Sequence, residues 1–364
     1  MYAFEPTEEQ VMLVETLNRY ASTGLRAKAH EADESAELPG SLIEKGWELG
    51  YLQASIPEAY GGFGERSVVT GALAAEELAW GDLAGALAVM APGLFATPLL
   101  LAGSEQQKVR YIPPVIQAEW QPYTAALLEP FFNFDPNELH SQAVPDDGGF
   151  TLSGEKSFVP YAAEAEAMIV YANLGGVTQG FIIPREAPGL EIGGRQKLMG
   201  INALPLYKVM LKEVRIPLEN RLGGADGHDF SPILDASRVA ISAMAVGISR
   251  AALEYSRDYA KEREVFGVKV AQKQAIAFML AEMATEIEAI RLLTWEAAWM
   301  LDNGKEEGSK NAYLAFTGAM DMAMMVTDRA VQILGGHGYI REHPVELWMR
   351  NARGIATFTG LAIV

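Results

Sequence analysis

Apolar residues recur at helical spacing through the first third of the chain. Residues 7–10, Thr-Glu-Glu-Gln, have the sequence of a capping box, in which two side chains satisfy backbone N–H groups at the start of a helix. The apolar face of the helix that follows consists of Val11, Val14, Leu17 and Tyr20. Helical patterns continue to about Tyr111, apart from the turn-rich segment 57–64. The pattern predicts a helical domain over residues 1–119.

One stretch of this domain, residues 83–104, contains no charged residue. Its length is close to the roughly 20 residues that a helix needs to span a bilayer. Pro92 and Pro98 divide it into two short pieces, and an acidic residue flanks each end. Because a proline interrupts helical hydrogen bonding, we expect a buried pair of helices here and no membrane span.

The middle third changes to short runs rich in β-branched and aromatic residues. The clearest runs are residues 150–153, 168–171, 180–183 and 209–211. Residues 146–149, Asp-Asp-Gly-Gly, have the composition of a tight hairpin turn. The run spacing predicts a β domain over residues 120–225, folded as a small barrel or sandwich.

Long helical periodicity returns in the last third. Its apolar positions are clearest at Ile276, Met279, Leu280, Met283, Ile287 and Ile290. Asn303 and Gly304 form a stop signal, and a further helix is expected over about residues 310–334. We predict a C-terminal helical bundle over residues 226–364. The fold class is therefore α+β, with the order helix, β, helix.

Composition narrows the function classes. The chain has 364 residues, of which 49% are hydrophobic, enough for two or three packed units. Its formal charge of −18 disfavours nucleic acid and anionic lipid as partners over most of the surface. The absence of cysteine excludes disulfides, thiolate metal sites and a cysteine nucleophile. The first ten residues lack the features of a secretory signal, so we expect a cytoplasmic protein.

Six short motifs occur in a consistent order along the chain. They lie at residues 46–62 (Gly-Trp-x-x-Gly, then Pro-Glu and Tyr-Gly-Gly), 103–113 (Gly-Ser-Glu-Gln-Gln-Lys, then Tyr-Ile-Pro), 128–130 (Leu-Glu-Pro), 154–156 (Gly-Glu-Lys), 263–274 (Arg-x-x-Phe-Gly, then Gln) and 332–338 (Gln-x-x-Gly-Gly-His-Gly). Together they resemble the acyl-CoA dehydrogenase family from end to end. The resemblance implies a homotetramer or related assembly, FAD held across a subunit interface, an acyl-CoA substrate between the β domain and the C-terminal helices, and electron transfer flavoprotein as acceptor.

The last two motifs supply groups suited to the ADP half of FAD. Arg263 offers a fixed cation for a pyrophosphate, Phe266 an aromatic wall, and Gln274 and Gln332 amides for adenosine. In the family, residues of this kind serve the FAD in the neighbouring subunit's site.

Two adjacent glycines complete this set. Gly335 and Gly336 allow a backbone to approach a phosphate or ribose where a Cβ would clash. The alternative is that Arg263 pairs with Glu262 or Glu264 on a solvated helix, and that residues 335–338 only end a helix.

Arg238 matches the family's arginine at the start of a helix beside the thioester and pantetheine channel. A surface salt bridge is the alternative role for this residue.

The acid-base residue of the family is missing. Residues 350–360 resemble the stretch that carries the catalytic glutamate, with Arg350 and Gly360 matching and Phe358 in place of tyrosine, but Thr359 occupies the position of the carboxylate. Some members keep the base directly before the conserved arginine, which here is Ser237. Neither hydroxyl removes a proton without a base of its own. Asp235 and Glu129 are outside candidates.

The half-site for the flavin ring also departs from the family. Leu128 stands in place of a threonine that bonds the flavin, and Phe134 in place of a serine that reaches the pyrophosphate. Pro160 replaces a threonine near the reactive nitrogen and offers neither a hydroxyl nor an N–H group. Each lost hydrogen bond costs about 0.5–1.5 kcal/mol net.

These departures suggest a non-catalytic subunit of a heteromeric acyl-CoA dehydrogenase, similar to the paired bacterial subunits that act on steroid-chain and other bulky acyl-CoAs. Such a subunit would lend its ADP-binding residues to FAD in a catalytic partner. Two alternatives remain open. One is a self-sufficient flavoenzyme with a displaced base, including a reductase that runs the reaction backward. The other is a flavin-free scaffold with the same fold.

Overall fold

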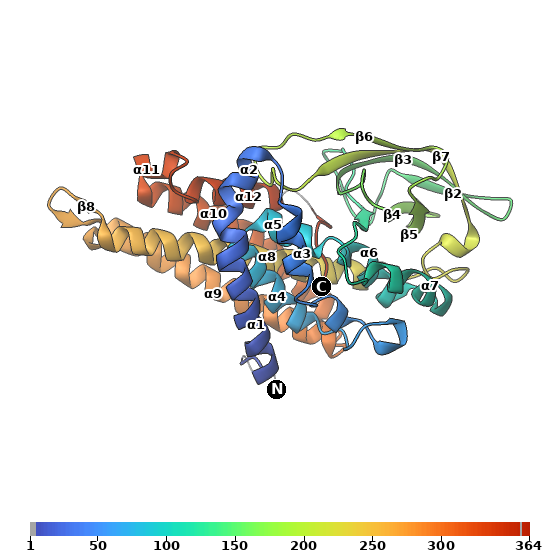
Figure 1. Ribbon diagram of the computed structural model, residues 1–364, viewed down its shortest axis with the longest axis horizontal. Helices are drawn as coiled ribbons and strands as arrows, with labels where there is room; N and C mark the ends of the chain where they lie inside the picture. Colours follow the sequence, from blue (N-terminus) through green and yellow to red (C-terminus); the bar gives the residue numbers. More distant parts are fainter. Residues whose placement is uncertain (1–4, 357–358) are drawn as a thin grey trace.

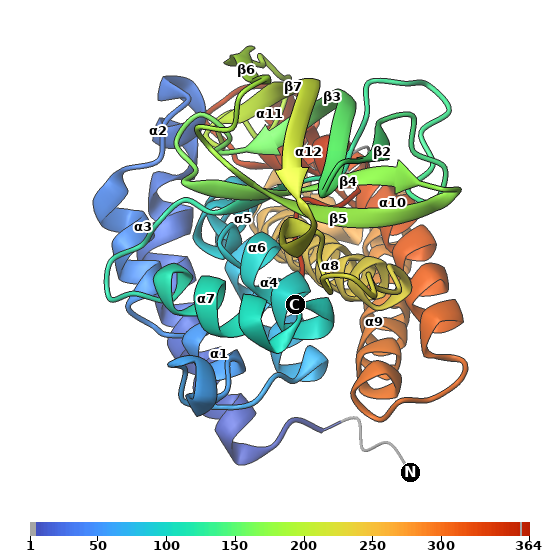
Figure 2. The ribbon, with the colours of Figure 1, turned by 90° about the vertical axis from the view of Figure 1, so that its right-hand side faces the viewer.

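The computed structural model describes residues 5–356 and 359–364. Figure 1 shows a bundle of helices at one end and a sheet packed beside it at the other, with helices from both ends of the sequence in the bundle. In Figure 2 the sheet lies across the top of these helices, with the N-terminal helices on one side and α9 and α10 on the other. The predicted α+β class and the order helix, β, helix are confirmed.

The first third is helical, as the sequence predicts. Its elements are α1 (Glu8–Tyr20), the π-helical η1 (Ala21–Arg26), α2 (Ala27–Ser35), α3 (Gly40–Trp47), α4 (Val68–Gly81), α5 (Leu83–Met90), α6 (Gly93–Ala102) and α7 (Glu105–Val115). The capping box is present, because the Thr7 side chain accepts from the Gln10 backbone N–H and the Gln10 side chain accepts from that of Thr7.

The uncharged stretch forms a buried, bent pair of helices. Helices α5 and α6 meet at an angle of 50° at the break before Gly93. Every residue of α5 is buried, as are the first seven of α6. The prediction of a buried pair is therefore confirmed. Helix α8 is also apolar and long enough to cross a bilayer, but most of its apolar stretch is buried inside the fold.

The middle third forms one seven-stranded mixed sheet. Its strands are β1 (Thr124–Ala126), β2 (Gln142–Asp146), β3 (Gly149–Pro160), β4 (Ala167–Leu174), β5 (Val177–Pro184), β6 (Leu190–Arg195) and β7 (Leu206–Pro217). The strand order is β1-β4-β2-β3-β7-β6, with β5 paired to β4. Strands β1 and β2 run parallel to β4, and the other pairs are antiparallel. The predicted hairpin joins β2 to β3, with Asp146 opposite Gly149.

The last third returns to helices. Its elements are α8 (Ser231–Glu262), the hairpin strands β8 (Glu264–Val265) and β9 (Val268–Lys269), α9 (Gln274–Asp302), α10 (Gly308–Leu334), α11 (Gly336–Tyr339) and α12 (Val345–Ile355). Helix α9 ends at Asp302, directly before the predicted stop signal at Asn303.

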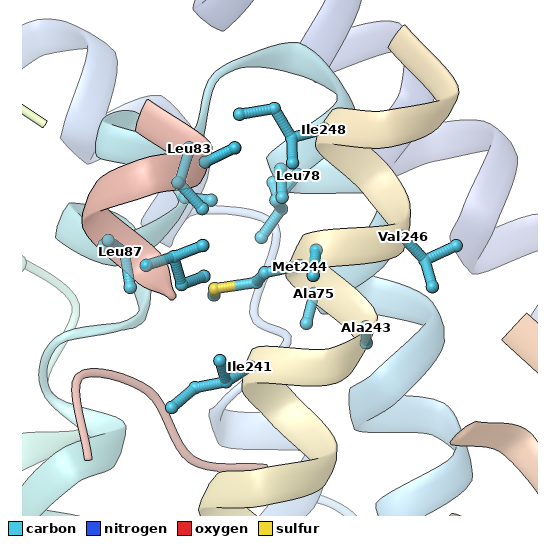
Figure 3. Close-up of a cluster of buried hydrophobic side chains, with 14 of the residues drawn as sticks. Ala75, Leu78, Leu83, Leu87, Ile241, Ala243, Met244, Val246 and Ile248 are labelled. Atoms are coloured by element: carbon cyan, nitrogen blue, oxygen red, sulfur yellow. The ribbon is translucent and has the colours of Figure 1, made fainter. Parts of the chain in front are cut away.

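The main core lies where α8 crosses α4 and α5. Figure 3 shows Met244 of α8 directed toward Leu83 and Leu87 of α5, while Val246 points to the opposite side of α8. Gly247 permits the close approach of α8 to α4, because a Cβ there would lie 2.1 Å from the carbonyl oxygen of Glu76. Side chains that fill such an interface at interior density fix the position of α8, which carries several of the candidate site residues.

The segment 361–364 lies inside the fold. All four of its residues are buried, and the C-terminal label stands among the helices in Figures 1 and 2. Gly360 precedes this segment with φ +86°, a conformation that favours glycine. The segment therefore contributes to the walls of the candidate site.

Candidate functional site

One of the two positions predicted for an acid-base residue, Ser237, lies at a small apolar cavity, and the residue after the other position lies there too. Ser237 of α8 and Gly360, the residue after Thr359, both line it. The other walls come from α6, β1 and its following residues, β4, the start of α8 and the C-terminal segment: Leu94, Pro98, Ala125, Leu127, Tyr171, Phe230, Ile233, Leu234, Ala362 and Ile363. The free space is about 20 Å³. Phe358 and Thr357 lie outside the described residues.

As does Tyr171, Ser237 brings a hydroxyl group to this lining. It is 5% exposed, and within the described chain its hydroxyl oxygen has no hydrogen-bond partner. In the part of the chain that the structure describes, the cavity walls carry no carboxylate. A serine hydroxyl has little basicity of its own, so it needs an adjacent base to remove a proton from carbon. Among the described residues, the cavity therefore contains the Ser237 hydroxyl, which has no hydrogen-bond partner, and no general base.

Glu129, an outside candidate for the base, is committed to structural bonds. Its carboxylate lies 2.8 Å from the Lys156 ammonium and accepts backbone N–H groups of His140 and Ser141 at 2.7 and 2.8 Å. Burial opposes ionisation, but the Lys156 charge and these hydrogen bonds hold the pKa of Glu129 below its ordinary value. Burial also lowers the pKa of Lys156 to about 8. A carboxylate held in this way is a poor general base near neutral pH.

Asp235, the other outside candidate, pairs with Arg238. The Asp235 carboxylate lies 3.1 Å from the guanidinium, whose side chain is 16% exposed. The guanidinium carbon also lies 5.0 Å from the centre of the Tyr313 ring. Arg238 thus forms an ion pair, although a partly buried one, and its expected role beside the thioester channel stays a prediction.

The half-site for a flavin ring is lined by apolar side chains that serve packing. Leu128 packs against the main core, and its carbonyl oxygen accepts the Ser157 N–H at 2.9 Å. Phe134 packs against a second core cluster beneath α6. Pro160 is buried at the end of β3, paired with Leu206 of β7. At these three positions the structure provides no side-chain donor or acceptor for a flavin ring, so the residues present fit that part of FAD poorly.

The candidate ADP residues lie at another end of the molecule. Arg263 directly follows α8, Phe266 lies in the turn between β8 and β9, Gln274 begins α9, and Gln332, Gly335 and Gly336 surround the junction of α10 and α11. Figure 1 shows β8 and α11 at the end of the bundle away from the sheet. All six residues are exposed, Phe266 at 93%. The Tyr259 hydroxyl, 2.8 Å from Nδ1 of His337, connects the end of α8 to α11.

Arg263 is available for an anion. In residues 5–356 and 359–364 it forms no ion pair, and Glu264 pairs instead with Lys269 at 2.8 Å. The alternative in which Arg263 pairs with Glu262 or Glu264 is therefore absent from this structure. Gly335 ends α10 and has φ +60° and ψ −128°, which side chains with a Cβ rarely adopt. An exposed, unpaired guanidinium next to accessible backbone fits the phosphates of a dinucleotide.

Sequence periodicity did not identify the walls of the cavity. Leu94 and Pro98 lie in the uncharged stretch, Tyr171 in a β-rich run, and Ile363 near the C-terminus. Their apolar character indicates burial, but apolar residues carry no local signal of which cavity they line. Ser237 was identified only through the family resemblance, because α8 also buries Ser242, Ser249 and Ser256.

Comparison with known proteins shows the family. Models of the N-terminal, middle and C-terminal domains of acyl-CoA dehydrogenase match residues 7–119, 124–214 and 230–362. An acyl-CoA dehydrogenase of Bacillus subtilis is 33% identical to this chain, with 97% of this chain and 95% of that protein covered. The caffeyl-CoA reductase-Etf complex subunit CarC of Acetobacterium woodii is 32% identical, with 92% and 89% covered.

A solved structure agrees with these matches. Butyryl-CoA dehydrogenase from Megasphaera elsdenii superimposes with a TM-score of 0.88 at 31% identity, covering 98% of this chain and 96% of that one. The agreement extends over all three parts of the fold. The chain therefore belongs to the acyl-CoA dehydrogenase family, whose members are FAD-dependent.

Proposed function

We propose that this chain is the non-catalytic subunit of a heteromeric acyl-CoA dehydrogenase and lends its ADP-binding residues to FAD seated on a catalytic partner. Bound FAD supplies the acceptor for a hydride from the β-carbon of the acyl thioester. This chain's own contribution is to hold the adenosine diphosphate end of that cofactor with Arg263, Gln274, Gln332 and the Gly335–Gly336 backbone.

The observation that carries the proposal is the missing base. Ser237 and the Thr359–Gly360 turn come from different elements, yet the cavity brings Ser237 and Gly360 together, and no carboxylate lies in its walls as far as the chain is described. α,β-Dehydrogenation needs a base that takes the α-proton. A cavity with a serine at one expected position, next to a threonine-glycine turn at the other, is suited to occupancy without turnover.

The remaining space in this cavity also favours a non-catalytic role. Ala362 and Ile363 line it, and about 20 Å³ stays free, roughly enough for a single water molecule. An acyl chain would have to displace these side chains. In addition, a flavin ring on this chain would receive no side-chain hydrogen bonds from Leu128, Phe134 or Pro160.

The separation of the two half-sites supports sharing with another chain. Ser237 and Arg263 are 26 residues apart along the continuous helix α8 and its cap, which corresponds to about 39 Å at 1.5 Å per residue. Groups so far apart are better suited to two different cofactor molecules than to one. The free Arg263 guanidinium is then a site for a cofactor whose ring lies on a partner.

The assembly and the acceptor follow from the same proposal. We expect a heterotetramer with the catalytic chain, located in the cytoplasm, with an acyl-CoA bound on that partner. Electron transfer flavoprotein is the proposed acceptor, by analogy with relatives such as the caffeyl-CoA reductase-Etf complex subunit. A bulky acyl group, such as a steroid side chain or a long fatty acyl chain, is the proposed substrate class.

The test is reconstitution with a catalytic partner. The chain is purified alone, and then together with a family member that keeps the catalytic glutamate and is encoded beside it. Acyl-CoA-driven reduction of an electron-accepting dye is measured for each preparation. We expect no reduction by the chain alone and reduction by the complex, abolished when the partner's glutamate is replaced by glutamine. Turnover by the isolated chain would contradict the proposal and favour a self-sufficient flavoenzyme with a displaced base.

A further inference from the structure

The loop between β1 and β2 carries an aromatic pair, Phe131 and Phe132, at the protein surface. Phe132 is fully exposed and Phe131 is 43% exposed. The Phe134 N–H donates to the carbonyl oxygen of Phe131 at 3.2 Å, so the pair lies in a turn, and the Phe134 side chain packs against the core cluster beneath α6. Large apolar side chains gain free energy when they leave water, so two adjacent exposed rings indicate a contact with another molecule.

Hydrogen bonds hold this loop in a defined position. The buried Glu129 carboxylate accepts the backbone N–H of His140 at 2.7 Å, which closes the base of the loop. Farther along, the Thr178 hydroxyl donates to the Pro136 carbonyl oxygen at 2.7 Å. The Phe131 ring lies against the His140 ring, with centres 4.2 Å apart. Because little of the loop has to become ordered, the aromatic pair is suited to anchor an interface.

The chemistry of this loop fits a cation. Residues 111–155 contain no lysine or arginine and seven acidic residues, of which Asp135 and Glu138 lie exposed in the loop itself. Lys156, the next cation along the chain, is buried and paired with Glu129 at 2.8 Å. Aromatic faces and carboxylates both attract a cation, whereas a diphosphate would find no positive charge on this segment.

The occupant of this surface comes from another molecule. Figure 1 shows β2, which directly follows the loop, at the opposite end of the molecule from β8, so the chain's own ADP-binding end does not reach the aromatic pair. Copies of this chain, each with a formal charge of −18, repel one another. A different chain is therefore favoured as the occupant.

The inference rests on the proposed function, in which the ADP-binding end of this chain reaches the flavin half-site of the catalytic partner. Two chains of the same fold that pair through matching surfaces are related by an approximate two-fold axis, so each contact occurs twice. The partner's ADP-binding end then reaches the flavin half-site of this chain. The aromatic pair belongs to that half-site, since it lies between Leu128 and Phe134 in the sequence. An arginine of the partner, equivalent to Arg263, would meet these rings instead of a diphosphate.

We propose that the aromatic pair docks on the cationic ADP-binding end of the catalytic partner, in the space that a cofactor diphosphate would otherwise occupy. The partner's guanidinium lies over the face of Phe132, while Phe131 stays against His140. This contact excludes water from the ring and the cation, which strengthens the attraction between them. The half-site without flavin thereby contributes to assembly of the two chains.

Assembly of the complex tests the aromatic pair. Phe131 and Phe132 are both replaced by serine in the full-length chain, and the dissociation constant for the catalytic partner is measured by sedimentation velocity. We expect at least tenfold weaker assembly. Phe63→Ser is the matched control, because Phe63 is 64% exposed on a different segment, and it should leave assembly unchanged. Equal assembly of the double variant and the native chain would overturn the proposal.

Single substitutions at Phe132 test the cation. Phe132→Trp should assemble at least as tightly as the native chain, because indole is the strongest aromatic partner for a cation. Phe132→Leu should assemble several-fold more weakly, and Phe132→Lys more weakly still, because a like charge then faces the guanidinium. If the double variant fails to fold, these variants still decide, since a fully exposed side chain contributes little to the core. Equal assembly of all three would contradict a cationic contact.

Dye reduction separates this inference from the proposed function. If the native complex turns over acyl-CoA and the isolated chain does not, but assembly is insensitive to Phe132, only the docking of the aromatic pair is wrong. Turnover by the isolated chain would instead contradict the proposed function, and this inference with it. A homo-oligomer that depends on Phe132 would identify a second copy of this chain as the occupant and would also overturn the proposal.

Discussion

At the residue scale, substitution of Thr359 distinguishes a chain that lacks only the catalytic base from a chain that also fails to bind the flavin ring. If only the base were missing, Thr359→Glu would restore it, because a glutamate at this position is the family's proton acceptor. We expect instead that Thr359→Glu leaves the isolated chain inactive, since Leu128, Phe134 and Pro160 still provide no side-chain hydrogen bonds for a flavin ring. The measurement is dye reduction with a series of acyl-CoAs after incubation with excess FAD.

Thr359→Gln is the control for this substitution, because it has a similar shape and cannot accept a proton. Acyl-CoA turnover that appears in Thr359→Glu and not in Thr359→Gln would show that the chain seats its own flavin. The non-catalytic account would then be wrong.

The buried pair of Lys156 and Glu129 is expected to be essential for stability. Lys156→Met leaves the Glu129 carboxylate buried without its cation, and breaking a buried pair in this way costs about 3–5 kcal/mol. Adding Glu129→Gln should recover part of this loss. Urea denaturation measures the free energy of unfolding of each variant.

Lys208 offers the matched comparison. It pairs with Glu155 near the surface, where its side chain is 43% exposed, so Lys208→Met should cost less than about 1 kcal/mol. Equal losses for the two lysine variants would show that burial does not set the strength of the Lys156 pair.

Asp82 gives a prediction about pH. Burial raises the pKa of this carboxyl to about 7, although it caps α5 by accepting the Gly85 N–H at 2.7 Å. The folded state therefore holds the proton more tightly than the unfolded chain. The stability gained from the protonated form is fully present below pH of about 4 and is lost as the pH rises through about 7.

Asn cannot ionise and caps helices as well as Asp does, so Asp82→Asn should remove this pH dependence. The quantity compared is the free energy of unfolding of the variant minus that of the native chain. We expect this difference to rise by a few kcal/mol between about pH 4 and pH 8. The free energy of unfolding in urea is measured across that range. Parallel curves for the two proteins would show that Asp82 titrates normally.

At the element scale, the end of the helical bundle formed by β8, β9 and α11 carries the proposed contribution to a partner's cofactor. In the complex, Arg263→Gln should weaken FAD binding by about tenfold to a hundredfold, because a hydrogen bond to a charged group contributes about 1.5–3 kcal/mol. FAD affinity of the deflavinated complex is measured by fluorescence. The partner's own residues are unchanged in this experiment.

Arg257→Gln in the same complex is the control, since Arg257 lies near the end of α8, before Arg263, and pairs with Asp258. It should leave FAD affinity unchanged. If Arg263→Gln also has no effect, this end of the bundle does not contact the cofactor.

The elements of this fold were predictable where a local pattern specifies them. Thr7, Asn303 and the turn at residues 146–149 signal helix and hairpin boundaries through short-range hydrogen bonding and backbone preference, and all three occur in the structure. The bent pair α5–α6 was also predictable, because Pro92 and the absence of charge point to buried short helices.

Contacts between distant elements were not predictable in the same way. Glu76 of α4 pairs with Arg250 of α8 at 2.5 Å and with Arg291 of α9 at 3.1 Å, far apart in sequence. The charges of these residues suggest solvent exposure, whereas Glu76 is 1% exposed.

At the scale of the whole molecule, the chain combines two unequal ends. One end presents the exposed residues that we propose to bind ADP, and the other encloses a small apolar cavity in which the described residues provide no general base. The formal charge of −18 makes Arg263 a local exception on an acidic protein, so phosphate binding there depends on specific contacts and gains little from the general field.

The flavin content of the co-purified complex tests this account most directly. Visible flavin absorbance is compared with the amount of each chain, quantified separately. The account predicts one FAD for each catalytic chain and none for this chain, so that half of all chains in a heterotetramer carry flavin. A stable homo-oligomer of this chain with one FAD per subunit would contradict it.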